Sequence, residues 1–418
     1  MSFPPEIIKE FISYVATDEG DTQNQRRAHL HTQCLVSRTW YGLAQPLLFA
    51  EITAFRTGHN QTGDRDTAEI TELLARTLID SPHTRSYVKT LSLGAASSHP
   101  RDPVIKIIEN LTTLEGLRIV HPEYEDAFLH ADLLKVLPKA LNSTHLTSLG
   151  FSELKLVPLS ILKYPLALEE LVIHHSTFDI PDLREGAAPS PAVQRPAPKV
   201  LILSASNLSE ADVLEGILLQ DGPLDISRIE EFWAMDRSDG EEVYGFVCTF
   251  TSAISSTLED VLINPPTDCF RSVELTERFP SEKLSNLRMA QFSVLQLSDE
   301  RYGYNAVPWV ISAITRLCNP EKLETIKLHC EFRNEESRTD EDLLDQGWVQ
   351  FDSELVSGRF SNLRELDIIF YDEENGLDNS ALLLKFSTLL DGASEEILMM
   401  DCSDESSYLS LVGPEWIR

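Results

Sequence analysis

Several features that define other protein classes are scarce or missing in this sequence. No apolar run approaches the ~20 residues that a membrane span needs, and Glu6, Lys9 and Glu10 interrupt the first apolar stretch, where a secretory signal would be continuous. The six cysteines form no CxxC pair and no Cys/His spacing typical of zinc, so we expect reduced thiols, no structural disulfide and no metal site. These absences predict a cytoplasmic or nuclear protein.

Catalytic signatures are missing as well. The sequence has no GxxxxGK[ST], GxGxxG, GxSxG or HExxH, so phosphate-cradling loops, nucleophile elbows and zincin helices have no support. We expect no catalytic residue and no cofactor, and a hydrolase hidden in an insertion is the least favoured alternative. Two small polar groups, His174-His175 with Asp179 and His121 with Glu123, are interpreted as surface residues beside strand ends rather than ligands or bases.

Basic residues are in short supply, with 35 Lys and Arg against 67 Asp and Glu, which gives a net charge of −32. Residues 1–56 hold six of the acids and five of the bases, a balance of −1, so the remaining −31 belongs to the rest of the chain. A field of this sign repels phosphate backbones and anionic lipid headgroups, and therefore disfavours binding to nucleic acid or to membranes. We expect protein partners whose surfaces are basic or neutral.

What the sequence does contain is a repeat. A six-residue pattern, apolar-x-x-apolar-x-apolar, recurs eleven times at intervals of about 30 residues. Its copies occupy residues 88–93, 114–119, 146–151, 168–173, 198–203, 229–234, 258–263, 284–289, 323–328, 363–368 and 394–399, the copies at 198 and 394 lacking the first apolar residue. Apolar residues at helical spacing lie between copies, at 70–78, 104–111, 246–254, 307–317 and 382–390.

One strand and one helix per repeat are typical of a solenoid. We therefore predict an α/β fold in which residues 57–418 form an irregular leucine-rich-repeat solenoid of about eleven repeats, with a parallel sheet on its concave face and helices outside. A doubly wound sheet is disfavoured, because strands apolar on both faces and a glycine-rich turn do not recur. Residues 181–198, with five prolines, predict a flexible surface loop.

Residues 1–56 stand apart from the repeats and predict three short helices. The first begins near Pro4, since proline suits the first turn of a helix. After a polar connection at 16–28, the second is expected over residues 30–38, and it leads into a third apolar segment at 39–52. Fewer than ~60 residues make a marginal core of their own, so part of this apolar surface is expected to be covered by another protein.

The same stretch resembles the F-box in the form common in fungal proteins. The opening of that motif, Leu-Pro-x-Glu-Ile-Ile, is similar to residues 3–8, its Leu-Val-Ser-Arg-x-Trp signature matches residues 35–40, and its closing Ala-x-Pro-Leu-Leu-Phe matches residues 44–49. Phe3 replaces the usual leucine, and the connection at 16–28 is longer and more polar than is typical.

The resemblance implies a substrate-recognition subunit of a Skp-cullin-F-box ubiquitin ligase. In such a protein the F-box binds the Skp adaptor, and through it a cullin scaffold, while the repeats hold the protein to be ubiquitinated. Carried onto matching positions, the resemblance assigns adaptor contact to Pro4, Ile7, Ile8, Phe11, Leu35, Val36 and Trp40. Some of these must instead form the core of the small helical motif itself.

In each repeat the residue between the last two apolar positions is expected on the open concave face. These residues are Ser92, Arg118, Gly150, Val172, Ile202, Trp233, Leu262, Arg288, Lys327, Asp367 and Leu398. The consecutive apolar members, Val172, Ile202, Trp233 and Leu262, are predicted to anchor the target protein. The acids two residues earlier, Glu170, Glu231 and Asp260, are expected to select Lys or Arg on that target. The alternative is that a loop or the C-terminal tail with Trp416 covers this row.

A second interpretation of the whole chain is an interaction scaffold without ligase recruitment. In that case the F-box-like segment caps the open end of the first repeat and binds no adaptor. Neither interpretation requires a catalytic residue.

Overall fold

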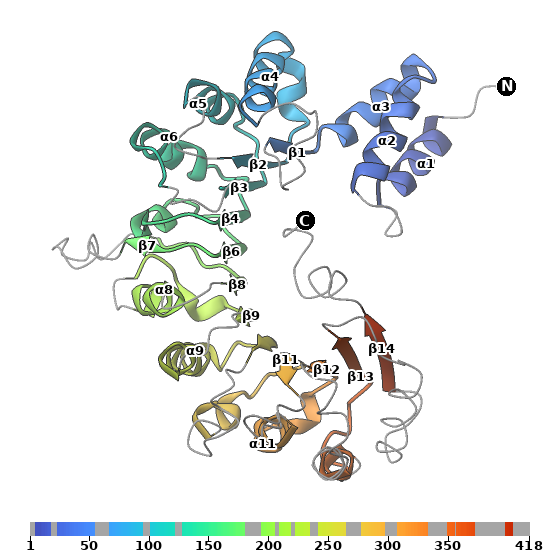
Figure 1. Ribbon diagram of the computed structural model, residues 1–418. Helices are drawn as coiled ribbons and strands as arrows, with labels where there is room; N and C mark the ends of the chain where they lie inside the picture. The colour runs from blue at the N-terminus through green and yellow to red at the C-terminus, as the bar shows by residue number, and fades with distance from the viewer. Residues whose placement is uncertain are drawn as a thin grey trace. The chain divides into compact units, whose positions relative to one another are not determined.

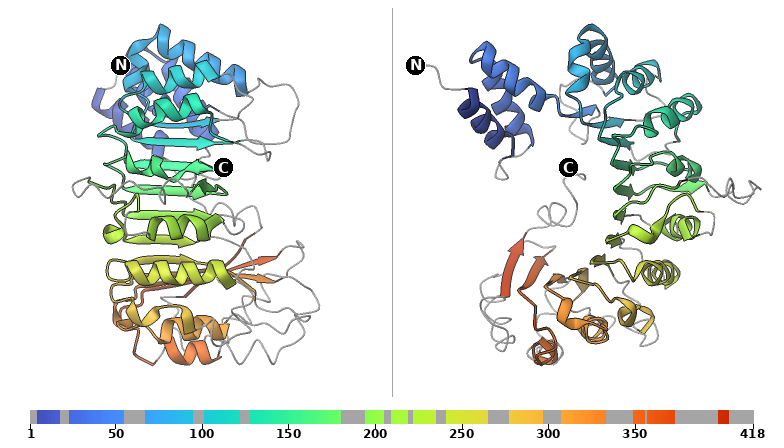
Figure 2. Two further views of the ribbon diagram at one scale, coloured as in Figure 1. Left: turned by 90° about the vertical axis from the view of Figure 1, so that its left-hand side faces the viewer. Right: turned by 180° about the vertical axis from the view of Figure 1, so that it is seen from behind.

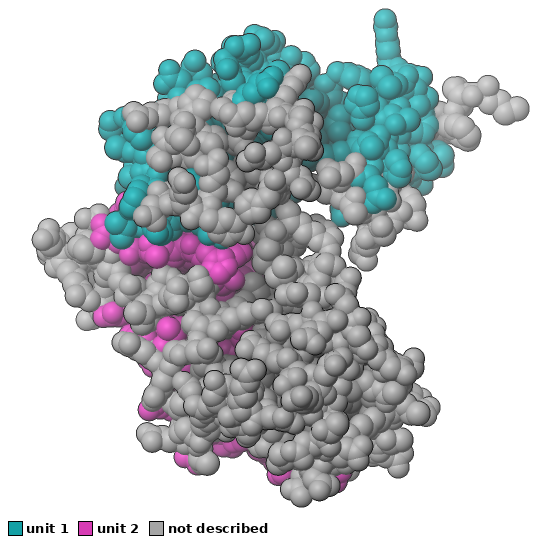
Figure 3. All heavy atoms as spheres, in the orientation of Figure 1, with its two compact units in different colours: residues 1–157, 161–168 teal, residues 158–160, 169–418 magenta. Residues whose placement is uncertain are grey.

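The computed structural model describes residues 5–17, 23–54, 67–94, 101–121, 128–179, 194–204, 209–218, 222–234, 241–264, 277–296, 307–332, 349–355, 357–372 and 398–403. The chain forms two compact units, coloured separately in Figure 3: unit 1 comprises Met1–Val157 and Ile161–Leu168, and unit 2 comprises Pro158–Ser160 and Glu169–Arg418. The predicted helix at 382–390 and most of the predicted loop at 181–198 lie outside the described residues.

Unit 1 begins with three helices: α1 (Pro5–Thr17), α2 (Gln23–Cys34) and α3 (Arg38–Leu48) (Figure 1). Their number is as predicted, but the predicted bounds of the second helix, 30–38, are wrong at both ends. The polar residues from Gln23 onward already form α2. The helix cannot continue to residue 38 because Ser37 has an extended backbone, and its side-chain oxygen accepts a hydrogen bond from the Trp40 N–H at 3.3 Å, which starts α3.

A small apolar core holds the three helices together. Its fully buried members are Ile8, Ile12, Leu30 and Ala44, with Cys34, Trp40, Leu43 and Leu48 packed around them. The motif is also tied to the chain that follows, because the Arg27 guanidinium donates a hydrogen bond to the backbone oxygen of Glu51 at 3.0 Å.

The repeats of unit 1 contribute four parallel strands, β1 (Glu51–Ala54), β2 (Thr90–Gly94), β3 (Gly116–Val120) and β4 (Ser148–Ser152), each paired with the next. The connecting segments include α4 (Thr67–Asp80), η1 (Pro82–Ser86), α5 (Arg101–Asn110) and α6 (Ala131–Leu141). Figures 1 and 2 show α4, α5 and α6 along one side of these strands. Strand β1 was not predicted, and it falls inside the stretch 1–56. The domain boundary predicted at residue 56 stays a prediction.

Unit 2 continues the pattern with eight parallel strands that pair in chain order: β6 (Glu170–His174), β8 (Val200–Ser204), β9 (Glu231–Ala234), β10 (Asp260–Ile263), β11 (Met289–Gln296), β12 (Thr325–Phe332), β13 (Glu365–Asp372) and β14 (Leu398–Ser403). Its helices are α8 (Ser209–Leu218), η3 (Ile226–Arg228), α9 (Glu241–Ile254), η5 (Ser281–Lys283), α11 (Val307–Thr315) and η6 (Pro320–Lys322). Residues 349–355 are helical as well, and the short elements β5 (Val157–Pro158), η2 (Leu159–Lys163) and β7 (Phe178–Asp179) lie between β4 and β8.

Parallel strands with helices between them confirm the predicted α/β fold of solenoid type. The helices expected near 70–78, 104–111, 246–254 and 307–317 correspond to α4, α5, α9 and α11. The hexads form the strands, because their apolar residues point at the helices: Leu91 and Leu93 on β2, for instance, are 0% and 1% exposed. Among the described residues, no helix has both the length and the apolar character needed to cross a bilayer.

Two hexads were assigned in the wrong register. The sequence around β11 fits the pattern in two phases, 284–289 and 287–292, and the structure takes the second, which buries Ala290 and Phe292 and pairs Gln291 with Leu262 and Lys327. The last hexad is shifted by one residue, because Met399 rather than Leu398 pairs with Asp367. A shift by an odd number of residues, three at β11 and one at β14, exchanges the two faces of a strand, so Arg288 and Leu398 are not members of the row in which they were predicted.

Hydrogen bonds connect each repeat to the next just before the strands begin. The carbonyl of Glu230, for example, accepts from the N–H of Glu259 at 2.7 Å and from that of Asp260 at 3.0 Å. Side chains add a second set of links, from Thr257 Oγ1 to the Ile229 carbonyl at 2.7 Å, from Asn286 Nδ2 to the Ser256 carbonyl at 2.6 Å and from Asn362 Nδ2 to the Glu321 carbonyl at 2.6 Å. Each of these side-chain hydrogen bonds satisfies a backbone carbonyl that lies outside the strands and is not paired in the sheet.

The core of unit 2 gives a direct test of this packing. Phe232 on β9 is fully buried, and its ring centroid lies 4.9 Å from that of Phe250 on α9. Phe232→Ala should lower the free energy of unfolding by about 3–5 kcal/mol, because it removes apolar contacts and leaves a cavity between strand and helix. Denaturant unfolding followed by circular dichroism measures the loss. Leu73→Ala, at a leucine of α4 that is about half exposed, is the control and should change stability by less than about 1 kcal/mol; equal losses would contradict the packing described.

Candidate functional site

Burial divides the residues predicted to contact an adaptor into two groups, those in the core of the helical motif and those on its surface. Ile8 is 5% exposed and belongs to the core, and Trp40 is half-buried against it. The exposed members are Ile7 (50%), Phe11 (52%), Leu35 (74%) and Val36 (60%), which we call the N-terminal apolar surface. Pro4 lies outside the described residues.

Leu35 and Val36 are the most exposed of the large apolar side chains in this motif. They follow the last residue of α2 and precede Ser37, whose cap begins α3, so local backbone geometry holds them outward at the turn between two helices. Two adjacent large aliphatic side chains in water lose the free energy that burial would supply, roughly 1.5–3 kcal/mol for each. A cluster of exposed apolar residues of this kind marks a surface for a partner.

Ile7 and Phe11 extend this surface along α1. They are four residues apart, so they lie on one face of the helix, while Ile8 and Ile12 face the core. The Phe11 ring meets Trp40 of α3 edge to face, with 5.8 Å between centroids. Trp40 therefore bridges the buried core and the exposed part of α1.

In unit 2, strand pairing brings the predicted target-binding residues together. Val172, Ile202, Trp233 and Leu262 occupy one row across β6, β8, β9 and β10, as the hexads predicted. Val172, Ile202 and Leu262 are buried, at 7%, 2% and 1% exposure, whereas Trp233 is half-buried. Trp233 is thus the member of this row whose side chain can still reach a second molecule.

The three predicted acids form a parallel row at the start of the same strands. Glu170 pairs with Val200, and Glu231 pairs with Asp260, and all three acids are half-buried. Burial raises the pKa of Glu231, and the negative charges of Asp260, Glu170, Glu230 and Glu259 raise it further. Burial also raises the pKa of Asp260, although Arg288 opposes that shift. The row therefore holds more negative charge than its neighbours compensate, and a cation placed beside it would be attracted.

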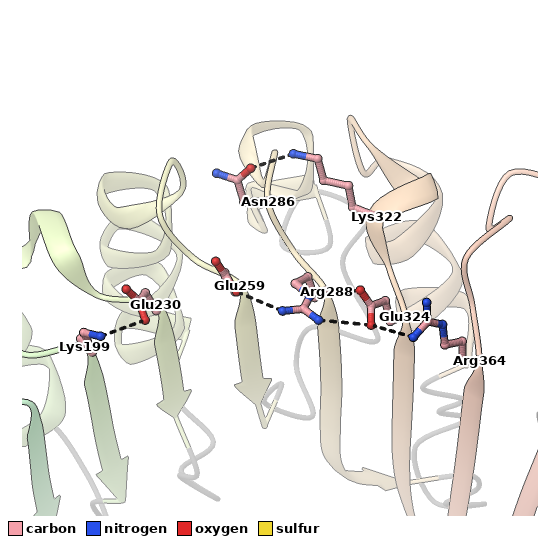
Figure 4. Close-up of polar contacts among 8 residues, drawn as sticks. All are labelled: Lys199, Glu230, Glu259, Asn286, Arg288, Lys322, Glu324 and Arg364. Carbon is pink, nitrogen blue, oxygen red and sulfur yellow. Dashed lines mark hydrogen bonds and ion pairs between the residues drawn. The ribbon is translucent and has the colours of Figure 1, made fainter.

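A third row, which the hexads did not predict, consists of the residue immediately before each strand of unit 2 from β8 to β13: Lys199, Glu230, Glu259, Arg288, Glu324 and Arg364 (Figure 4). We call it the charged row. Its salt bridges run from Lys199 Nζ to Glu230 Oε2 (4.0 Å), from Arg288 to Glu259 (3.5 Å) and to Glu324 (3.1 Å), and from Arg364 to Glu324 (3.9 Å).

Arg288 is the centre of the charged row, since it binds carboxylates of both neighbouring repeats. Its hydrogen bond to Glu324 lowers the pKa of that carboxyl and raises the pKa of the guanidinium. Lys89 and Glu115 form the equivalent pair in unit 1, 2.6 Å apart. The charged row could have been predicted from the sequence, because each of these residues is the second in its hexad once the copy around β11 is placed at 287–292.

The histidines interpreted as surface residues are more enclosed than expected. His121 is 5% exposed, and its backbone N–H donates a hydrogen bond to the Ser152 carbonyl at 3.0 Å. His174 and His175 are half-buried with ring centroids 4.2 Å apart, and burial, followed by the charge of His175, lowers the pKa of His174 to about 3. His121 directly follows β3, His174 ends β6, and His175 follows it, so all three lie at strand ends as expected, but they are enclosed rather than on the surface. Glu123 lies outside the described residues.

We call the row of Val172, Ile202, Trp233 and Leu262 the inner row; its next member is Gln291 on β11, which forms a buried polar pair with His329 on β12. Gln291 Nε2 and His329 Nε2 are 2.7 Å apart, and burial lowers the pKa of His329 to about 4, helped by the nearby Lys327. A neutral imidazole can accept this hydrogen bond from the amide, so the pair needs no net charge.

Comparison with known proteins identifies no family for this chain. No family model matches the sequence, and no curated protein matches it. Among solved structures the chain is similar to one described as the crystal structure of Rad7 and Elc1 complex in yeast, with 13% sequence identity, a TM-score of 0.31, and coverage of 90% of this chain and 91% of that chain. Function is therefore inferred from this chain's own residues.

The acid row makes a prediction about stability and pH. A carboxyl whose pKa is raised on folding binds its proton more tightly in the folded chain, so stability falls as pH rises from the ordinary glutamate value of 4.5 through the folded pKa, and it remains lower above that. Glu231→Gln should therefore raise the free energy of unfolding at neutral pH, by less than about 1 kcal/mol because the side chain is partly solvated.

The measurement is denaturant unfolding of both proteins from about pH 4 to about pH 7.5. The gain from Glu231→Gln should vanish at the acid end, where wild-type Glu231 is itself neutral. Glu10→Gln, at an exposed glutamate of α1, is the control and should give no such pH-dependent difference. A variant equally stable or less stable than wild type at neutral pH would show that Glu231 is not under electrostatic strain.

Proposed function

We propose that this protein is a non-enzymatic substrate receptor of a cullin-type ubiquitin ligase, working in the cytoplasm or nucleus. Its N-terminal helical motif binds a Skp-type adaptor, which links it to a cullin scaffold, and its repeats bind a target protein. The single observation that carries the proposal is the exposure of Leu35 and Val36 within a stretch that resembles the F-box signature over residues 35–40.

The assignment of adaptor contacts follows from burial. Leu35, Val36, Ile7 and Phe11 have exposed apolar surface that a partner can cover, and Trp40 packs against Phe11. Ile8 acts through the core of the motif, since its side chain is already covered. Pro4 remains a proposed contact on the resemblance alone.

For the target protein, we propose contact at the inner row of unit 2. Trp233 is the accessible anchor, and Val172, Ile202 and Leu262 form the apolar surround that excludes water from it. Tryptophan anchors with a surround of this kind account for much of the affinity at protein interfaces. The acids Glu170, Glu231 and Asp260 favour a target with Lys or Arg next to the segment that covers Trp233.

The adaptor interaction can be tested with the full chain and a purified Skp adaptor. Leu35→Ala combined with Val36→Ala should weaken binding by at least about tenfold, because two apolar side chains leave the interface. Isothermal titration calorimetry measures the dissociation constant. Leu73→Ala, another exposed leucine, should leave it unchanged. If wild type shows no binding to any Skp adaptor tried, the ligase role is wrong.

The target interaction needs a different comparison. Trp233→Ala should lose at least one protein that wild type captures from cells of the source organism while retaining the adaptor, as judged by quantitative mass spectrometry. Leu156→Ala, at an exposed leucine of unit 1, should retain both. An unchanged set of captured proteins, with the circular dichroism spectrum intact, would rule out Trp233 as the anchor.

The alternative of a scaffold without ligase recruitment has one observation in its favour. Strand β1 follows α3 directly and pairs with β2, and Arg27 donates a hydrogen bond to its first residue, so the helical motif is joined to the end of the sheet in unit 1. Capping, however, gives no reason for Leu35 and Val36 to be solvent-exposed, and the adaptor titration separates the two roles.

A further inference from the structure

The helical motif differs in charge from the rest of the chain. From the start of α2 to the end of α3, 26 residues contain no Asp or Glu, although the chain's frequency of 67 acids in 418 residues would give about four. The same segment holds Arg26, Arg27 and Arg38 together with His29 and His31. Residues 23–48 are therefore a positively charged segment in a protein whose net charge is −32.

The arginines of this positively charged segment have different structural roles. Arg27 is half-buried and is used internally, through its hydrogen bond to the Glu51 carbonyl. Arg38 is exposed, and it follows Leu35 and Val36 by only three and two residues. It occupies the first position of α3, where the positive end of the helix dipole disfavours a cation, so its placement does not serve the stability of that helix.

We infer that the partner surface covering Leu35 and Val36 carries carboxylates that face Arg38. The inference rests on the proposed function and adds the chemistry of the adaptor side: an apolar pocket bordered by negative charge. Charge complementarity supports this occupant, because an acidic partner is attracted by residues 23–48 and repelled by the −31 carried after residue 56. An acidic adaptor would therefore bind at the motif and avoid the repeats, which remain available for a basic target.

The test is a titration of the full chain with a purified Skp adaptor at two salt concentrations, about 0.1 M and about 1 M, where the Debye length is roughly 10 Å and 3 Å. Arg38→Glu should weaken binding by about tenfold at the lower salt and by less than about threefold at the higher, because a charge at the rim of an interface is screened. Lys9→Glu is the matched control. It makes the same change of charge in the same motif, but Lys9 is two residues from both Ile7 and Phe11 and so faces the opposite side of α1.

Three outcomes are distinguishable. Loss of affinity with Arg38→Glu that salt removes, with little effect of Lys9→Glu, supports the inference. Equal effects of the two variants would show a response to net charge alone, and a loss that persists at the higher salt would show a steric or structural effect, and either overturns it. If Leu35→Ala with Val36→Ala also leaves adaptor binding unchanged, the proposed function fails as well, whereas weakened binding of that double variant leaves it standing.

Discussion

The parallel registration of each strand against the next is the constraint on which the other features depend. It is set before the strands begin, where one carbonyl accepts two N–H groups of the following repeat, as Arg288 does from Glu324 at 2.8 Å and Thr325 at 3.1 Å. Once that bond pair is fixed, every side chain of a repeat lies beside its counterpart in the neighbouring repeat. The apolar hexads, the acid row, the inner row and the charged row are all consequences of this single alignment.

The alignment also explains which parts of the fold could be predicted. Leucines at hexad spacing identify strands because only one face of each strand is covered by helices, and that periodicity is visible in the sequence. The register around β11 could not be read in this way, since Leu284 and Leu287 both begin an acceptable hexad. The structure resolves the choice through Phe292, whose ring packs on Trp309 with centroids 5.4 Å apart, a contact between residues on separate elements that a local pattern cannot contain.

The candidate surfaces were predicted unevenly for similar reasons. The F-box-like signature located Leu35 and Val36, and a capping serine immediately after them could have shown that they lie in a turn. The row from Val172 to Leu262 was placed correctly because strand register is periodic, but its burial was not evident, since burial depends on segments distant in sequence. The charged row was not predicted, because the hexad pattern fixes its apolar positions and does not show which polar positions of neighbouring repeats are paired.

Binding to two partners through surfaces of different charge is the physical basis of the proposed role. The apolar surface of the helical motif has a basic border, while the repeats carry the acidic excess, so each partner is selected by polarity as well as by shape. No chemical step is required of this chain under the proposal.

The position of Arg288 between Glu259 and Glu324 in the charged row has a consequence for how such a chain can change over time. Excision of the segment that carries Arg288 would join Glu259 to Glu324 as neighbours, two carboxylates without a cation between them. Loss of this one turn is thus opposed by electrostatics, because Glu259 would keep no cation beside it, whereas the existing acidic neighbours Glu230 and Glu259 have Lys199 and Arg288 on their outer sides. At this position, lengthening of the loops is therefore a less costly route to variation than loss of the turn.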